Sequence, residues 1–271
     1  MIKFFRKIRK NLLRKNKFSK YLLYAIGEII LVVIGILIAL QINNWNENRK
    51  GRIQELSSMK EVVENLKYDM VRCDNNINKN ATVIKGLDSL RTSISNAIDG
   101  NDQATDIYYY ALKYGIDYNK AVLNRAAYEE LINSGSIKAI DNRTLVQQLS
   151  DYYQRIAFTV PEFRPKTGYE NMQTSRKKFI SFKGLEPFLQ SFDTINKVSF
   201  SVDYDFKDIQ QMEHLKLLQP HELALTDYYN DIAQFQIDLK TYIFYMSWVK
   251  EAANDLILDI KKEYQLTDTI E

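Results

Sequence analysis

The chain has 271 residues, of which 45% are hydrophobic and 26% are charged, and its formal net charge is +3. The first 20 residues hold nine basic residues and no acidic one, so the rest of the chain carries a net charge of −6. A mildly acidic body with its excess positive charge at one end argues against a nucleic-acid partner. A single cysteine, Cys73, excludes an intramolecular disulfide and a cysteine-based metal cage.

Few residues that break helices are present, and this predicts an all-α fold. The chain has nine Gly and four Pro, and dense β-branched runs are confined to one apolar segment. We expect a single amino-terminal transmembrane helix that continues into an elongated extracytoplasmic helical bundle. The expected parts are a basic cytoplasmic tail over residues 1–20, a transmembrane helix over 21–45 and a periplasmic helical domain over 46–271.

Residues 1–20 mix basic side chains with apolar ones such as Phe4, Phe5 and Ile8. This amphipathic pattern suits a segment on the inner leaflet, where each Lys or Arg near anionic lipid contributes about 1 kcal/mol. The tail suits equally well a basic flank that only sets the topology. Both interpretations predict anionic inner-leaflet lipids as neighbours.

Residues 21–42 form an apolar run of 22 residues, which spans about 33 Å as a helix and matches a hydrocarbon core of about 30 Å. A secretory signal would be shorter and end in small residues, whereas this run leads into the polar sequence QINNW. Trp45 at one end and Tyr21 and Tyr24 at the other suit interfacial aromatic belts. The basic flank predicts a bacterial inner-membrane protein with a cytoplasmic amino terminus and a periplasmic body.

Within this run Glu28, Val32, Gly35 and Ala39 share one helical stripe. Gly35 and Ala39 form a small-xxx-small pair, which lets a second helix approach closely. A carboxylate inside a membrane is costly when charged, so Glu28 should face protein rather than lipid. Three roles remain open for Glu28: helix association, a proton or ion relay, and a passive position near the interface.

A heptad pattern follows the apolar run and predicts a long helix over about 50–98. Eleven of its thirteen positions are apolar: Leu56, Met59, Val63, Leu66, Met70, Cys73, Ile77, Asn80, Ile84, Leu87, Arg91, Ile94 and Ile98. The pattern is typical of a coiled-coil seam. Whether the seam packs on this chain's own later helices or on a second copy stays open. Cys73 is expected to be a small buried apolar residue.

The middle of the body is expected to hold a partly helical aromatic stretch over 104–120 and helices over about 121–160. The sequence Ser134-Gly135-Ser136 predicts a helix stop, and Asp141 is the expected cap of the next helix. Pro161 and Pro165 are expected to interrupt that helix.

Residues 181–205 are the least helical part and are expected to be irregular, with at most a short hairpin. Helical character returns near Asp208, breaks at Pro220 and resumes in a final helix over about 224–265. The segments 149–157 and 225–233 share six of nine residues, LSDYYQRIA against LTDYYNDIA. Either an old duplication or a shared packing problem accounts for this echo.

Catalytic signals are absent from the sequence, and we expect no enzyme, no cofactor and no metal site. No phosphate-binding glycine loop, nucleophile elbow or metalloprotease motif occurs. His214 and His221 are the only histidines, and Pro220 between them breaks the helical register that a shared metal would need.

Residues 16–49, NKFSKYLLYAIGEIILVVIGILIALQINNWNENR, resemble the opening of a family of uncharacterised single-span inner-membrane proteins of Gram-negative bacteria. Residues 128–135, YEELINSG, and the segment 149–153 look like the body of the same family. The family has no assigned activity. The resemblance therefore implies a membrane anchor with a periplasmic helical domain, and it provides no catalytic residue.

The expected function is non-enzymatic assembly or scaffolding through helix–helix contacts, with a second copy or another membrane protein as partner. Two alternatives stay open. The body could be a sensory or ligand-binding bundle that signals through a partner, with pocket aromatics from 108–110 or from Tyr152 and Tyr153. The chain could also be an accessory subunit of an ion-driven membrane complex that uses Glu28.

Overall fold

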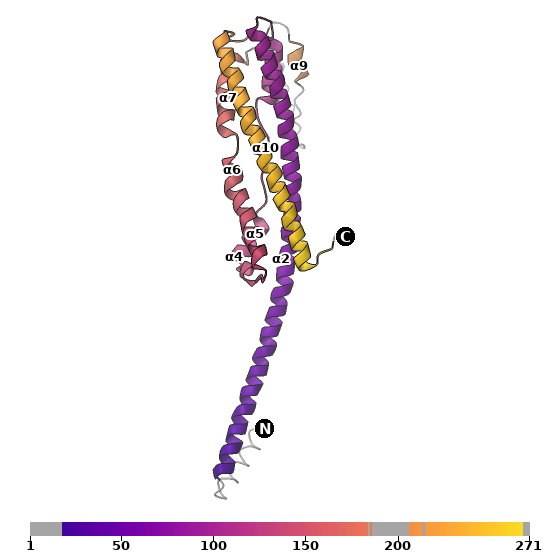
Figure 1. The fold of residues 1–271 in the computed structure, drawn as a ribbon, viewed down its shortest axis with the longest axis vertical. Helices are drawn as coiled ribbons and strands as arrows, with labels where there is room; N and C mark the ends of the chain where they lie inside the picture. Colours follow the sequence, from indigo (N-terminus) through magenta and orange to yellow (C-terminus); the bar gives the residue numbers. More distant parts are fainter. Residues whose placement is uncertain (1–17, 184, 186–205, 213–214, 268–271) are drawn as a thin grey trace. The chain divides into compact units, whose positions relative to one another are not determined.

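The computed structural model describes residues 18–183, 185, 206–212 and 215–267 (Figure 1), and the basic tail before residue 18 lies outside them. Helices account for most of this part, and no strand occurs in it, so the all-α prediction is confirmed. The helices are α2 (Phe18–Ile98), α3 (Ala104–Tyr114), α4 (Ala126–Asn133), α5 (Arg143–Gln154), α6 (Val160–Glu162), α7 (Lys166–Phe179), α9 (Lys207–Gln210) and α10 (Glu222–Tyr264). A 3-10 turn, η1 (Ser136–Ala139), and a π-helical turn, η2 (Arg155–Thr159), lie between them.

The chain divides into two compact units, Met1–Ser58 and Met59–Glu271. In the described part of the first unit every residue is helical and belongs to α2. The second unit holds the rest of α2 and all later elements, and it contains the buried core.

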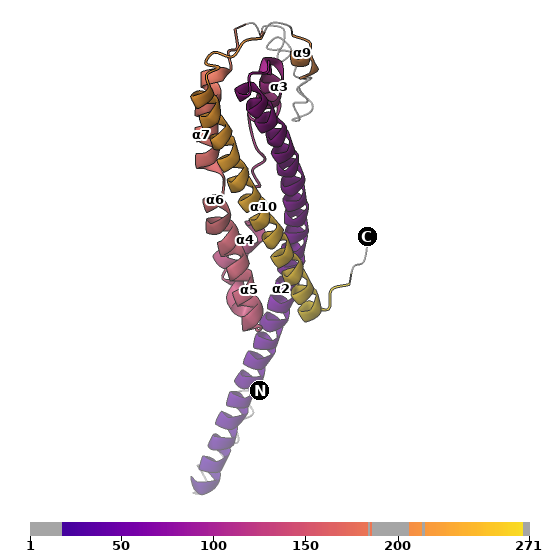
Figure 2. The ribbon, with the colours of Figure 1, turned by 45° about the horizontal axis from the view of Figure 1, so that its top comes forward.

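In the second unit α10 runs beside α2 and also beside the chain segment that carries α5, α6 and α7 (Figure 2). The predicted seam on α2 faces this core, because each of its positions from Met59 to Ile98 is buried or half-buried. The seam therefore packs on the chain's own later elements. For example, Arg91 on α2 donates to the Tyr229 hydroxyl at 2.6 Å and to Gln236 Oε1 at 3.2 Å, both on α10.

α10 confirms the predicted final helix and its inward face. Ile232, Phe235, Leu239, Tyr242 and Met246 are fully buried. The helix begins at Glu222, slightly before the expected start, because His221 caps it: the Nδ1 atom of His221 accepts a hydrogen bond from Ala224 N at 3.2 Å.

α5 confirms the helix expected after the stop at 134–136, but the predicted cap was wrong by one residue. Asn142, not Asp141, is the cap, since its Oδ1 accepts a hydrogen bond from Leu145 N at 3.1 Å. The cap side chain must reach an amide in the first turn, and α5 begins at Arg143, so the residue directly before it takes this role.

Pro161 was expected to interrupt this helix, and instead the helix passes through it by way of η2. In η2 the amide of Val160 donates to Arg155 O, five residues back. This wider turn lies where the ring of Pro161 would otherwise meet the carbonyl group four residues earlier. The helix ends at Glu162, and Pro165 then precedes α7.

α7 was not predicted, because its sequence is mostly polar. Its buried face consists of Gly168, Met172, Ser175, Arg176 and Phe179. Gly168 allows α7 to approach α10 closely, since a Cβ there would lie 2.3 Å from Asp238 Oδ2 and 3.2 Å from Phe235 Cα.

Two further expectations differ from the structure. Residues 121–125 were expected to be helical, but α4 begins only at Ala126. Near Asp208 only the four-residue α9 forms. Most of the expected irregular segment, 186–205, lies outside the described residues.

Candidate functional site

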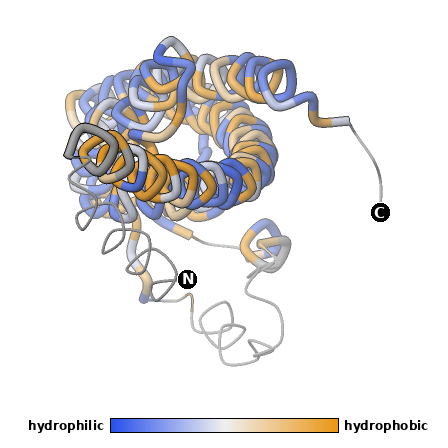
Figure 3. The backbone as a smooth tube through the Cα atoms, turned by 90° about the horizontal axis from the view of Figure 1, so that it is seen from below, coloured by the Kyte–Doolittle hydropathy of each residue, from blue (hydrophilic) through white to orange (hydrophobic). Residues whose placement is uncertain are grey.

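The first unit presents an apolar helical surface. One 18-residue window has a mean hydropathy of 2.6 and none of it is buried, so the helix is long and apolar enough to cross a membrane (Figure 3). The large apolar side chains from Ile26 to Ile42 are between 47% and 72% exposed. Water is a poor solvent for such a surface, and a membrane or another apolar partner would cover it.

The predicted association face lies on this surface. Val32, Gly35 and Ala39 are exposed, and Glu28 is half-buried. A Cβ on Gly35 would meet no atom within 4 Å, so the small-residue pair is open to a second helix. Its role in association stays a prediction.

The predicted interfacial anchors are described only in part. Trp45 is 65% exposed, and the Arg49 guanidinium lies 5.7 Å from the centre of its ring. The side chains of Tyr21 and Tyr24 lie outside the described part. Their place at a membrane interface therefore remains a prediction.

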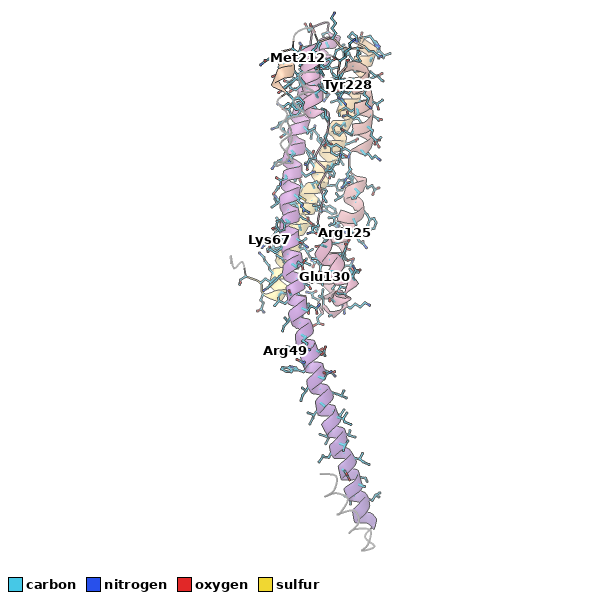
Figure 4. The ribbon with its side chains drawn as sticks, turned by 180° about the vertical axis from the view of Figure 1, so that it is seen from behind. Arg49, Lys67, Arg125, Glu130, Met212 and Tyr228 are labelled. Carbon is cyan, nitrogen blue, oxygen red and sulfur yellow. The ribbon has the colours of Figure 1, made fainter. Side chains whose placement is uncertain are left out.

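The second unit has a site that the sequence did not suggest. Residues 115–125, which we call the strap, join α3 to α4 without forming a helix. The strap lies between α2 and α10, and Arg125 at its end is labelled in Figure 4. Polar side chains of the surrounding helices form hydrogen bonds to its main chain.

Asn76 and Asn80, one turn apart on α2, hold the centre of the strap and are fully buried. Asn119 O accepts hydrogen bonds from Asn76 Nδ2 at 2.8 Å and from Asn80 Nδ2 at 3.0 Å. Asn119 N donates to Asn80 Oδ1 at 2.8 Å. Both the donor and the acceptor of this strap residue are therefore satisfied by side chains from one helix.

The neighbouring strap residues are held in the same way. The Tyr242 hydroxyl on α10 accepts from Ala121 N at 3.0 Å, and Arg164 Nη2 donates to Ala121 O at 3.2 Å. Arg72 Nη1 donates to Val122 O at 2.9 Å. On α7, Tyr169 and Gln173 donate to the carbonyl oxygens of strap residues 116 and 115.

Asp69 closes the other end of the strap. Its Oδ1 accepts from Asn124 N at 2.7 Å, and its Oδ2 accepts from the Tyr152 hydroxyl of α5 at 3.2 Å. Burial raises the pKa of Asp69 to about 6, against the lowering effects of these two hydrogen bonds and of Arg72. Burial and the nearby Asp69 carboxylate also raise the pKa of Tyr152.

Cys73 lies one turn beyond Asp69 and is fully buried, as predicted. Burial raises the pKa of its thiol to about 12, with further contributions from Asp69 and Asp74. The thiolate that nucleophilic chemistry requires is therefore strongly disfavoured at neutral pH.

The other candidate residues serve packing or capping roles. His221 caps α10, and His214 lies outside the described part, where the structure contains no group of three or more possible metal ligands. The Tyr108 hydroxyl donates to Lys216 O at 3.1 Å and accepts from Ser181 N at 2.9 Å. Two hollows of about 410 and 550 Å³ are described in this unit, and neither is lined by Tyr108–Tyr110, Tyr152 or Tyr153.

The two echoing segments bury the same positions. Leu149 and Ile156 in the first, and Leu225 and Ile232 in the second, are all buried. The first tyrosine of each pair, Tyr152 or Tyr228 (labelled in Figure 4), is also buried. Shared packing against the core thus suffices to explain the echo, and duplication stays open.

The sequence contained a signal for the strap site that periodicity alone does not reveal. Asp69, Asn76 and Asn80 are polar residues on the buried side of an otherwise apolar seam. A polar side chain at such a position needs a partner, because an unpaired buried polar group is costly. The partner, however, lies about 40 to 55 residues further along the chain.

A family described as "Family of unknown function (DUF6090)" matches residues 28–203, well over half of the chain. The chain belongs to this family. Membership of an uncharacterised family, expected from the resemblance, is confirmed, whereas the family's distribution among bacteria stays a prediction. The matched range contains Glu28, the strap and all of its partners except Tyr242. No curated protein and no solved structure matches the chain.

Proposed function

We propose that this chain is a non-enzymatic, membrane-anchored helical protein that acts in assembly or scaffolding through helix–helix contacts. The observation that supports this proposal is the exposed apolar surface of residues 25–42, which carries the open pair Gly35 and Ala39. Small residues at such a pair let two helices pack closely where lipid offers no competing hydrophobic driving force.

The proposed setting is the bacterial inner membrane, with a cytoplasmic amino terminus and a periplasmic body. The nine basic residues that precede the apolar run support this orientation, because such residues stay on the cytoplasmic side. They would also contact anionic lipids of the inner leaflet. The partner is a second copy or another membrane protein.

Cysteine crosslinking in native membranes tests the association face. The variants Gly35→Cys and Ala39→Cys place a thiol on the face, and Leu37→Cys places it on the opposite side of the same helix as a matched control. All three carry Cys73→Ser. We expect disulfide-linked dimers from the first two variants and not from the control.

A lack of dimers at both face positions would contradict self-association. Purification of the intact chain in mild detergent then decides whether another membrane protein occupies the face. If the chain purifies alone and monomeric, the assembly proposal is wrong.

A further inference from the structure

The strap is a segment whose local preference is overridden by its surroundings. Residues 121–125 precede α4 directly, and their sequence favours extension of that helix. Eight side chains instead hold the strap outside any helix: Asp69, Arg72, Asn76, Asn80, Arg164, Tyr169, Gln173 and Tyr242. Such a conflict between local and global preference is expected at functional sites.

All eight side chains bond to main-chain atoms of the strap rather than to its side chains alone. Main-chain atoms are the same in every polypeptide, so these contacts select an extended backbone and not one particular sequence. Recognition of extended peptides by other proteins rests on the same type of main-chain bonding. The groove around the strap is thus chemically a peptide-binding groove.

The burial pattern of the strap indicates which extended conformation the groove fits. Gly115, Tyr118 and Ala121 are buried, whereas Asp117, Lys120 and Val122 are exposed. This three-residue period matches the three residues per turn of a polyproline II helix, whose backbone groups are all free to bond outward. The Tyr118 ring packs with its centre 5.3 Å from that of Tyr169 and 5.8 Å from that of Phe235. The groove therefore takes an aromatic residue followed, three residues later, by a small one.

The groove cannot simply be emptied. Asp69, Asn76 and Asn80 are fully buried, and departure of the strap without a replacement would break their hydrogen bonds to it. A second extended segment would supply the same main-chain groups. Exchange of one segment for another is therefore far less costly than opening alone.

We propose that the groove formed by α2, α7 and α10 binds an extended, polyproline-II-type segment of a partner protein, which enters by displacing the strap. The strap is then an internal occupant that keeps the groove filled in the free chain. This site lies wholly in the second unit, and it does not depend on the membrane-anchor proposal.

The first test uses the full chain in detergent and a fluorescent peptide with the sequence of residues 115–125. The variant Tyr118→Ala weakens the strap but leaves the groove residues intact. Because strap and peptide compete, we expect this variant to bind the peptide about tenfold more tightly than the unaltered chain. A control peptide with proline in place of Ala121 lacks the N–H that Tyr242 accepts, and it should bind about tenfold more weakly. If the folded variant binds both peptides equally, or neither, the proposal is wrong.

A second test needs no variant and remains decisive if Tyr118→Ala fails to fold. The amides of Asn119, Ala121 and Asn124 are bonded only to side chains, so they should exchange hydrogen by local opening of the strap. We expect their exchange to be about 100-fold faster than that of buried α10 amides such as Leu239. Exchange at the same rate as the α10 amides would show that the strap leaves only on global unfolding, which would overturn the proposal.

Discussion

At the scale of single residues, the buried face of α2 combines apolar packing with polar side chains that bond to the strap. Asp69 is the one among them that can change charge. It keeps two hydrogen bonds, yet burial still favours its neutral form and raises its pKa to about 6. A group with these properties makes the stability of the second unit depend on pH.

The direction of that dependence follows from proton binding. The folded chain binds the Asp69 proton more tightly than the unfolded chain, whose carboxyl has its ordinary pKa of 3.8. The stabilising contribution of Asp69 is thus fully present below about pH 3.8 and is lost as the pH rises through about 6. We therefore expect Asp69→Asn to raise the free energy of unfolding at pH 7.5 by on the order of 1–3 kcal/mol, and by much less at pH 4.

Urea unfolding followed by circular dichroism at both pH values measures this difference. Asp227→Asn on α10 is the control, because Asp227 is exposed and makes none of the bonds to the strap. A decrease in stability at pH 7.5 for Asp69→Asn would show that the charged carboxylate is the favoured partner of the strap.

Glu28 is the second residue whose role can be tested singly. If it supports helix association by hydrogen bonding, Glu28→Gln should retain the Gly35→Cys crosslink, whereas Glu28→Leu should reduce the crosslinked fraction several-fold. The crosslinked fraction in membranes is the measurement. Loss of the crosslink in Glu28→Gln would indicate that the negative charge itself is needed, as an ion-driven complex would require.

At the scale of elements, helical period alone predicted the parts of the chain in which the buried face is apolar. The seam of α2 and the inward face of α10 follow this rule, so their side chains were placed correctly. α7 was missed because it buries Gly168, Ser175 and Arg176, which carry no apolar pattern. The strap was taken for helix because the Asn and Asp side chains that hold it come from a distant part of the sequence. Single-sequence periodicity contains no information about such partners.

The contact between α7 and α10 is where a single methyl group should have the largest effect. We expect Gly168→Ala to destabilise the second unit by about 1–3 kcal/mol. Asp238 can move away from the new Cβ, but Phe235 Cα at 3.2 Å belongs to the backbone of α10 and cannot do so cheaply.

The matched control is Gly51→Ala, another helical glycine, whose added Cβ would meet no atom within 4 Å. This substitution should be neutral or stabilise its helix by up to about 1 kcal/mol. Thermal unfolding of both variants followed by circular dichroism compares them. Equal effects would show that the α7–α10 approach is not close enough to need a glycine.

At the scale of the whole molecule, the proposed membrane orientation makes a prediction that the chain's own cysteine controls. Cys73 is buried and burial raises its pKa to about 12, so the unaltered chain should not react with a maleimide until it is unfolded. In that background, Thr226→Cys introduces an exposed thiol on α10, and Lys3→Cys introduces one in the basic tail.

Intact spheroplasts treated with a membrane-impermeant maleimide distinguish the two orientations. Because the basic residues before the apolar run should stay in the cytoplasm, we expect labelling of Thr226→Cys in intact spheroplasts and of Lys3→Cys only after lysis. The opposite pattern would place the body in the cytoplasm, and labelling of both thiols in intact spheroplasts would exclude a membrane-spanning chain. Since buried Cys73 does not react, each signal reports on the introduced thiol alone.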